Sequence, residues 1–273
     1  MKHFNQLNDY FVRYLFTDKG SEPLLLDFIN SVMISADMKT FKSLEILNPF
    51  NLKKNYKDKE TIVDVKCITK NGTVVIIEVQ LAGNSRFPER ILYYWALNYS
   101  KLLKKGEKYD ALTPVISINL LNFNLNKNNG NIHSCYMIYD TRNKKLLTDH
   151  LQIHIIELKK FKKNILAKDL NCWLDFFTNK NLEDKMSEIV KEKPIMEEAQ
   201  KRYNNFIKSR LMMSEYEKKE VYLYEKQIML EEERKEGKLE EKEEIAKTMK
   251  SKNMDIKLIS EITGLSIEEI LKL

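Results

Sequence analysis

The chain has 273 residues, of which 43% are hydrophobic and 10% aromatic, which is enough to bury a core and excludes a disordered chain. Its longest apolar stretches, 74–77 and 114–121, are far shorter than the roughly 20 residues of a membrane helix, so we expect no transmembrane segment. The first residues lack the apolar core of a secretory signal, and we therefore expect a cytoplasmic protein. Three cysteines without CxxC spacing predict packed thiols rather than disulfides or a zinc site.

The net charge of +6 is unevenly distributed along the chain. Residues 1–165 contain 25 Lys and Arg against 16 Asp and Glu, whereas residues 166–273 contain 21 against 24. The first part therefore carries +9 and the second −3. A basic compact domain suits a polyanion such as DNA, although a lysine-rich surface is also common in proteins that bind no nucleic acid.

Two helices are expected in the first 35 residues, because apolar side chains recur there at helical spacing. From Thr61 the period changes to two, which predicts a β-hairpin with strands 61–68 and 73–80 joined at Asn71-Gly72. This hairpin is the strongest local pattern in the sequence.

A helix is expected next, with Asn84 or Ser85 as its cap, and it should run to Lys105 before Gly106. Three further strand patterns follow, at 115–121, 132–139 and 151–158. Together these elements predict an α/β fold with a mixed sheet of about five strands flanked by helices, followed by a helical C-terminal region.

The C-terminal region is helical in pattern throughout. We expect an α/β domain over 1–165, a helical region with a charged spacer over 166–240, and a C-terminal helical hairpin over 241–273. Ser266 and Glu269 match a capping box, which predicts that the last helix begins directly after Ser266. The last helix is acidic, so we expect it to dock a second copy or a partner protein rather than DNA.

Glu78 and Gln80 are two residues apart in a strand, so both side chains point to one face of the sheet. Asp64 lies across the hairpin, and the loop length decides its orientation. A two-residue turn would point Asp64 away from Glu78, whereas a three-residue loop with left-handed Gly72 pairs the two acids directly. We predict the three-residue loop. Paired carboxylates are destabilising unless a cation neutralises them, which favours a metal site. The alternative is that the two acids are polar residues at strand ends that face solvent.

The pattern Asp64, hairpin turn, Glu78-Val79-Gln80 is similar to the core of the PD-(D/E)XK nucleases. Its surroundings, in order and spacing, resemble the Rpn-type recombination-promoting nucleases, also called PD-(D/E)XK nuclease family transposases. They are Ile62 to Lys66, Ile76 to Gln80, Arg90 with Tyr93-Tyr94, Gly106 with Tyr109, Val115 to Ile118, and the tail from Thr263 to Ile270. The resemblance spans most of the chain and implies a restriction-endonuclease-like core over 1–165.

The resemblance implies that Asp64 and Glu78 ligate Mg²⁺, which polarises the scissile phosphate and activates a water. Gln80 stands where many relatives have lysine; it can orient the water but supplies no positive charge. Lys66, on the same face as Asp64, is a candidate to supply the positive charge that Gln80 lacks.

A further acidic ligand is expected from the N-terminal helices. Asp9, Glu22, Asp27 and Glu45 are candidates, and the family pattern favours Asp9. Arg90 and Tyr94, one turn apart on the helix after the hairpin, are candidate substrate contacts, although the tyrosine also fits the core face of that helix.

The expected function is therefore metal-dependent hydrolysis of DNA phosphodiesters, with little sequence specificity, in recombination or mobile elements. Two alternatives remain: a nuclease-like protein that holds DNA without cutting it, and a toxin or phage-defence effector. The sequence contains no GxxxxGK[ST], GxGxxG or GxSxG motif, which disfavours NTP hydrolysis, dinucleotide binding and serine-hydrolase chemistry.

Overall fold

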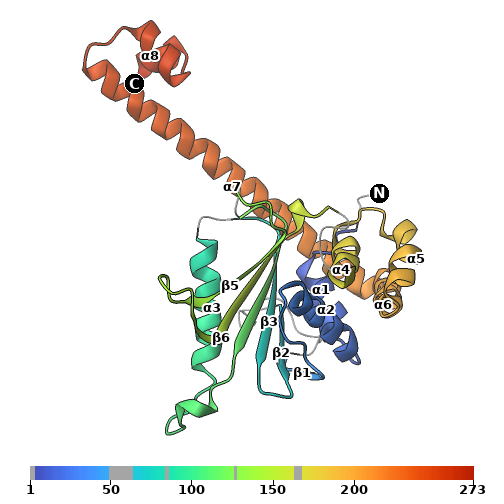
Figure 1. Ribbon diagram of the computed structural model, residues 1–273. Helices are drawn as coiled ribbons and strands as arrows, with labels where there is room; N and C mark the ends of the chain where they lie inside the picture. The colour runs from blue at the N-terminus through green and yellow to red at the C-terminus, as the bar shows by residue number, and fades with distance from the viewer. Residues whose placement is uncertain (1–3, 49–63, 84–85, 126–127, 163–167) are drawn as a thin grey trace. The chain divides into compact units, whose positions relative to one another are not determined.

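The computed structural model describes residues 4–48, 64–83, 86–125, 128–162 and 168–273. They fall into two compact units, Met1–Tyr216 and Glu217–Leu273. The first unit holds a six-stranded mixed sheet in the order β1-β2-β3-β4-β6-β5, which confirms the expected α/β fold with a helical C-terminal region (Figure 1). The strands are β1 (Leu44–Ile46), β2 (Val65–Thr69), β3 (Val74–Gln80), β4 (Val115–Leu121), β5 (His133–Tyr139) and β6 (Leu146–Glu157).

The central strands run parallel and the outer pairs antiparallel. β3 pairs with β4, and β4 with β6, in parallel, whereas β2 joins β3, and β5 joins β6, as antiparallel neighbours. The three-residue strand β1 was not predicted, because it is too short to show a period. It pairs with β2, and its Leu44 and Ile46 pack against the main core. Strand β6 begins at Leu146, before the predicted position 151, where its exposed first residues pair with β5.

The β2–β3 loop has the predicted three residues. Thr69 pairs with Thr73 through the bond from Thr69 N–H to Thr73 O (2.9 Å), and Gly72 has φ +81° in the left-handed region. The strands then continue in register to the pair Val65 and Ile77. Residues 61–63 of the predicted first strand lie outside the described part of the chain.

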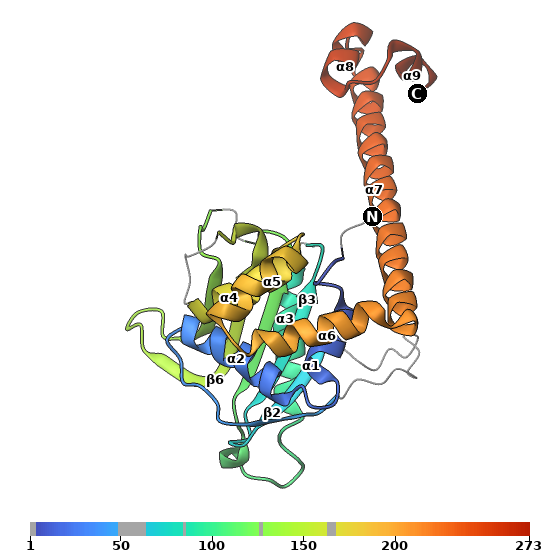
Figure 2. The same ribbon diagram turned by 90° about the vertical axis from the view of Figure 1, so that its right-hand side faces the viewer.

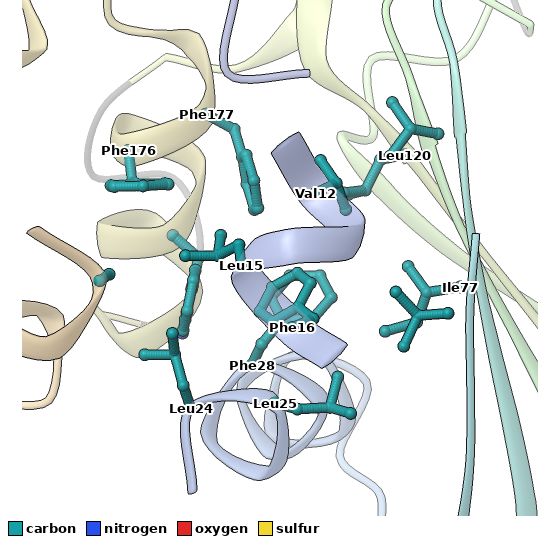
Figure 3. Packing of buried hydrophobic residues seen from close by; sticks show 14 of the residues in the cluster. Val12, Leu15, Phe16, Leu24, Leu25, Phe28, Ile77, Leu120, Phe176 and Phe177 are labelled. Atoms are coloured by element: carbon teal, nitrogen blue, oxygen red, sulfur yellow. The ribbon is translucent and has the colours of Figure 1, made fainter. Parts of the chain in front are cut away.

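One face of the sheet is covered by five helices of the first unit (Figures 1 and 2). They are α1 (Asp9–Thr17), α2 (Glu22–Ser35), α4 (Lys168–Thr178), α5 (Leu182–Glu192) and α6 (Met196–Lys208). Helix α1 lies between α4 and the sheet. Its fully buried Phe16 contacts Trp173 and Phe177 of α4, and Leu15 also faces α4, whereas Val12 and Phe16 face Leu120 and Ile77 of the strands (Figure 3). Asp9 is the first residue of this helix.

The opposite face is covered by α3 (Phe87–Ser100), which lies along the sheet on the far side from α1 (Figure 1). Phe87, Ile91 and Trp95 pack on this face. Pro88 lies in the first turn, and the predicted caps at 84 and 85 lie outside the described residues. The helix ends at Ser100, five residues before the predicted Lys105.

The second unit contains most of α7 (Arg210–Ser251), α8 (Ile256–Thr263) and α9 (Ile267–Lys272). A small core of Ala246, Ile259, Leu265 and Ile270 holds the three helices together. Gly264 ends α8 in the left-handed conformation, and Ser266 with Glu269 forms the predicted capping box. In the described residues, no helix is both long and apolar enough to cross a membrane.

Substitution of Gly72 tests the loop conformation. A Cβ at this position would lie 2.9 Å from Thr113 Cγ2, and a β-branched residue is strained at positive φ. We expect Gly72→Val to lower the free energy of unfolding by about 2 kcal/mol, measured by urea denaturation. Gly130→Val is the matched control, since nothing lies within 4 Å of its Cβ position, and it should change stability by less than about 0.5 kcal/mol. Equal effects at both glycines would contradict the assignment.

Candidate active site

Asp64 lies at the open end of the β2–β3 hairpin. The side chain of Asn48 fixes the start of β2, since its Oδ1 accepts from Lys66 N–H (2.7 Å) and its Nδ2 donates to Asp64 O (3.3 Å). In the described residues, the pairs between β2 and β3 run as far as Val65 with Ile77. Beyond that pair, the Oδ2 atom of Asp64 accepts from the Val79 N–H at 2.7 Å.

Glu78 lies on the α3 side of β3, and the hairpin register, continued by one residue, puts Asp64 opposite it. Its side chain is only 3% exposed. Oε2 accepts a long hydrogen bond from Gln80 Nε2 (3.4 Å), and Oε1 is buried without a hydrogen-bond partner among the described residues. Gln80 in turn accepts from Arg90 Nη2 (2.5 Å), so a chain of polar contacts runs from helix α3 to the buried acid.

The two acids differ from ordinary carboxyl groups in their pKa. Burial raises the pKa of Asp64 to about 8, helped by the negative charges of Asp9 and Glu78 and opposed by the Val79 N–H. Burial likewise raises the pKa of Glu78 to about 7, while the Arg90 charge and the Gln80 hydrogen bond lower it. Buried acids with such shifts are typical of functional sites.

Among the four N-terminal acids, Asp9 is the one whose charge acts on Asp64. It is half-buried at the first position of α1. Asp27 instead accepts from Trp173 Nε1 (2.8 Å) and pairs with Lys193 (3.0 Å). Glu22 and Glu45 are exposed. The structure thus brings Asp9, Asp64 and Glu78 into one electrostatic cluster and leaves the other three acids outside it.

The remaining predicted residues lie around this cluster. Lys66 is half-buried on the same face, opposite Ile76 in the register, and burial together with the nearby Lys101 charge lowers its pKa. Tyr94 is half-buried on α3, where its ring contacts Tyr93 with centroids 5.9 Å apart, whereas Ile91 and Trp95 form the core face of that helix.

Two neighbours of the cluster were not predicted. Arg13, one turn after Asp9, lowers the pKa of Asp64. Asn119 is the β4 partner of Glu78; it is fully buried, its Nδ2 donates to Ser117 Oγ (3.0 Å), and its Oδ1 has no partner in the described structure. The pattern Ser117-Ile118-Asn119, polar at alternate positions of an apolar strand, was the available signal for Asn119.

The donor set fits a divalent cation at this position. Asp64 and Glu78 offer carboxylate oxygens, and Glu78 Oε1 is a buried oxygen for which the described residues provide no proton donor. Within the described ranges, no three His, Cys, Asp or Glu side chains surround one point closely enough to hold a metal ion by themselves. Any bound cation would therefore take further ligands from water or substrate.

A mixed sheet with helices on both faces, and a hairpin that carries Asp64 beside its first strand and Glu-x-Gln at the end of its second strand, is the arrangement of a nuclease-like α/β domain. The sequence matches the profile of the PD-(D/E)XK nuclease family transposases over residues 6–233, and the chain belongs to this family. Neither the curated proteins nor the solved structures searched gave a significant match.

The raised pKa of Glu78 predicts a pH-dependent cost to stability. Its carboxyl ionises near pH 4.5 when unfolded and near 7 when folded, so stability falls as the pH rises through this window. In EDTA, we expect Glu78→Gln to gain about 2 to 3 kcal/mol relative to the wild type between pH 4.5 and 8, measured by urea denaturation. A stability difference that does not change with pH would contradict the buried acid.

Proposed function

We propose that this family member is a Mg²⁺-dependent DNA endonuclease, which hydrolyses phosphodiester bonds with little sequence specificity in recombination or mobile elements. The observation that carries the proposal is the pair Asp64 and Glu78, two acids of raised pKa at the open end of one hairpin in a nuclease-family chain. Such acids are costly to bury unless a cation compensates them.

In this proposal Asp64 and Glu78 hold the cation, and Asp9 is the further acid on the α1 side. A bound Mg²⁺ would polarise the scissile phosphate and acidify a water. The Val79 N–H holds the Asp64 carboxylate in position. The amide of Gln80 bonds Glu78 on one side and Arg90 on the other, so it keeps the Glu78 carboxylate oriented and remains able to orient a water.

DNA is the proposed substrate because the basic charge is concentrated in residues 1–165. Arg90 and Tyr94, on the helix beside Gln80, are proposed to contact it. The helices of the second unit are proposed to dock a second copy or a partner protein, since their outer side chains include the exposed Ile262 and Leu271. The proposed setting is the cytoplasm.

Plasmid cleavage tests the proposal. We expect the wild type to nick supercoiled plasmid in Mg²⁺, and EDTA or Asp64→Ala to reduce the rate at least about a hundredfold. Asp110→Ala is the matched control, since this acid is exposed and lies on the short helix after α3, and its rate should equal that of the wild type.

The neutral Gln80 favours one alternative, a nuclease-like protein that binds DNA without cutting it. Wild-type DNA binding with a cleavage rate no higher than that of Asp64→Ala would establish that alternative. Toxicity on expression that disappears with Glu78→Gln would instead point to a toxin or phage-defence effector with the same chemistry.

Lys66 is proposed as an additional cation on the face of the site. Its amine is half-buried, and loss of its charge removes attraction for a phosphate without removing a core side chain. We expect Lys66→Ala to lower the turnover rate by about tenfold at most, with an unchanged melting temperature. Turnover equal to that of the wild type would exclude this role.

A further inference from the structure

Resting on the proposed function, we propose that Arg90 is a catalytic residue that supplies the positive charge at the scissile phosphate, and that Gln80 serves to hold it there. The charge that lysine carries on the strand in many relatives would thus come from helix α3 in this chain. This assigns to Arg90 the compensation that the sequence suggested for Lys66.

The guanidinium of Arg90 is held in place from two directions. Its Nη2 donates to Gln80 Oε1 at 2.5 Å, and its central carbon lies 5.4 Å from the centroid of the Phe87 ring. Phe87 is 1% exposed and packed in the core between α3 and the sheet. A guanidinium bonded on its edge and covered by an immobile ring has little freedom to leave the site.

On each side of Gln80, one buried polar atom is left without a hydrogen-bond partner in the described residues. Arg90 Nε is a buried donor, and Glu78 Oε1 a buried acceptor, and neither has a hydrogen-bond partner among the described residues. An unused cationic donor and an unused carboxylate oxygen, linked through one amide, match a ligand that combines an anionic oxygen with a cation. A phosphodiester together with its divalent ion has this composition.

Arg90 is joined to the buried acid through one residue, since the Gln80 amide accepts from Arg90 Nη2 and donates to Glu78 Oε2. Arginine keeps its charge at every pH of interest, so this positive charge is permanent. Lys66 lies on β2, where its partner in the register is Ile76. The contact of Arg90 with Gln80 therefore favours Arg90 over Lys66 as the replacement for the strand lysine.

Moving the positive charge from position 90 to position 80 by mutation tests the proposal. Five variants are compared with the wild type: Arg90→Gln, Gln80→Lys, the double variant of both, Arg86→Gln, and Arg86→Gln combined with Gln80→Lys. Arg86 is the matched control, since it precedes the same helix, has an 85% exposed side chain and loses the same charge. Each variant is assayed for plasmid cleavage, and for binding of a cleavage-resistant phosphorothioate duplex in Ca²⁺ at several salt concentrations.

We expect Arg90→Gln to lower kcat about a hundredfold or more, as loss of one transition-state donor does. Gln80→Lys should lower kcat in the presence of Arg90, through repulsion, and raise it at least about tenfold in the Arg90→Gln background. It should not rescue Arg86→Gln. The slope of log Kd against log salt should fall by about 0.9 in Arg90→Gln and return in the double variant.

If Arg90 only supports the fold, Gln80→Lys should change kcat in the same direction with and without Arg90. If Arg90→Gln unfolds, Arg90→Lys replaces it, and retention of most of the activity then supports the charge. A double variant no better than Arg90→Gln in both assays overturns the proposal. Absence of cleavage by the wild type contradicts the proposed function. If the salt slope of DNA binding still falls in Arg90→Gln and returns in the double variant, the contact between Arg90 and a phosphate is supported nevertheless.

Discussion

In a β-hairpin, the length of the loop decides which side chains of the two strands share a face. Here three loop residues and a left-handed Gly72 put Asp64 opposite Glu78, and the rest of the site is arranged around that pairing. Asn48 fixes the start of β2, the Val79 N–H fixes the Asp64 carboxylate, and the α1 core brings Asp9 to the same end of the sheet. The chemistry of the site thus depends on backbone geometry more than on any one side-chain contact.

The pairing has a cost that the core must offset. Burial disfavours the charged forms of both acids, and Glu78 Oε1 and Asn119 Oδ1 both lack partners in the described structure. The aromatic core between α1, α2 and α4, with Phe16, Phe28 and Trp173 fully buried, provides the opposing stability. A site of this kind is stable only because it is built onto a large hydrophobic core, with its ligands on short strand ends rather than long loops.

The local elements of the fold were predictable from the sequence because their signals are local. The hairpin loop and the capping box at Ser266 each depend on a few adjacent residues, and both are confirmed. The end of α3, strand β1 and the packing of α4 to α6 on the α1 core depend on contacts between distant residues, which no local pattern contains. The same holds for the site. The position of Asp64 opposite Glu78 follows from loop length, whereas the contact of Arg90 with Gln80 exists only once α3 folds over the sheet.

The loop also limits what a sequence motif can reveal about related chains. Loss of a single codon within Lys70-Asn71-Gly72 would remove one loop residue and leave the hydrophobic core residues and every acidic residue of the motif unchanged. To keep the two strands paired, however, one strand would have to shift by one residue, which moves its side chains to the opposite face of the sheet, or the loop would have to adopt a strained conformation. Such a homologue would keep its Asp and Glu-x-Gln letters although the two acids no longer share a face, so the spacing between these letters carries as much information as the letters themselves.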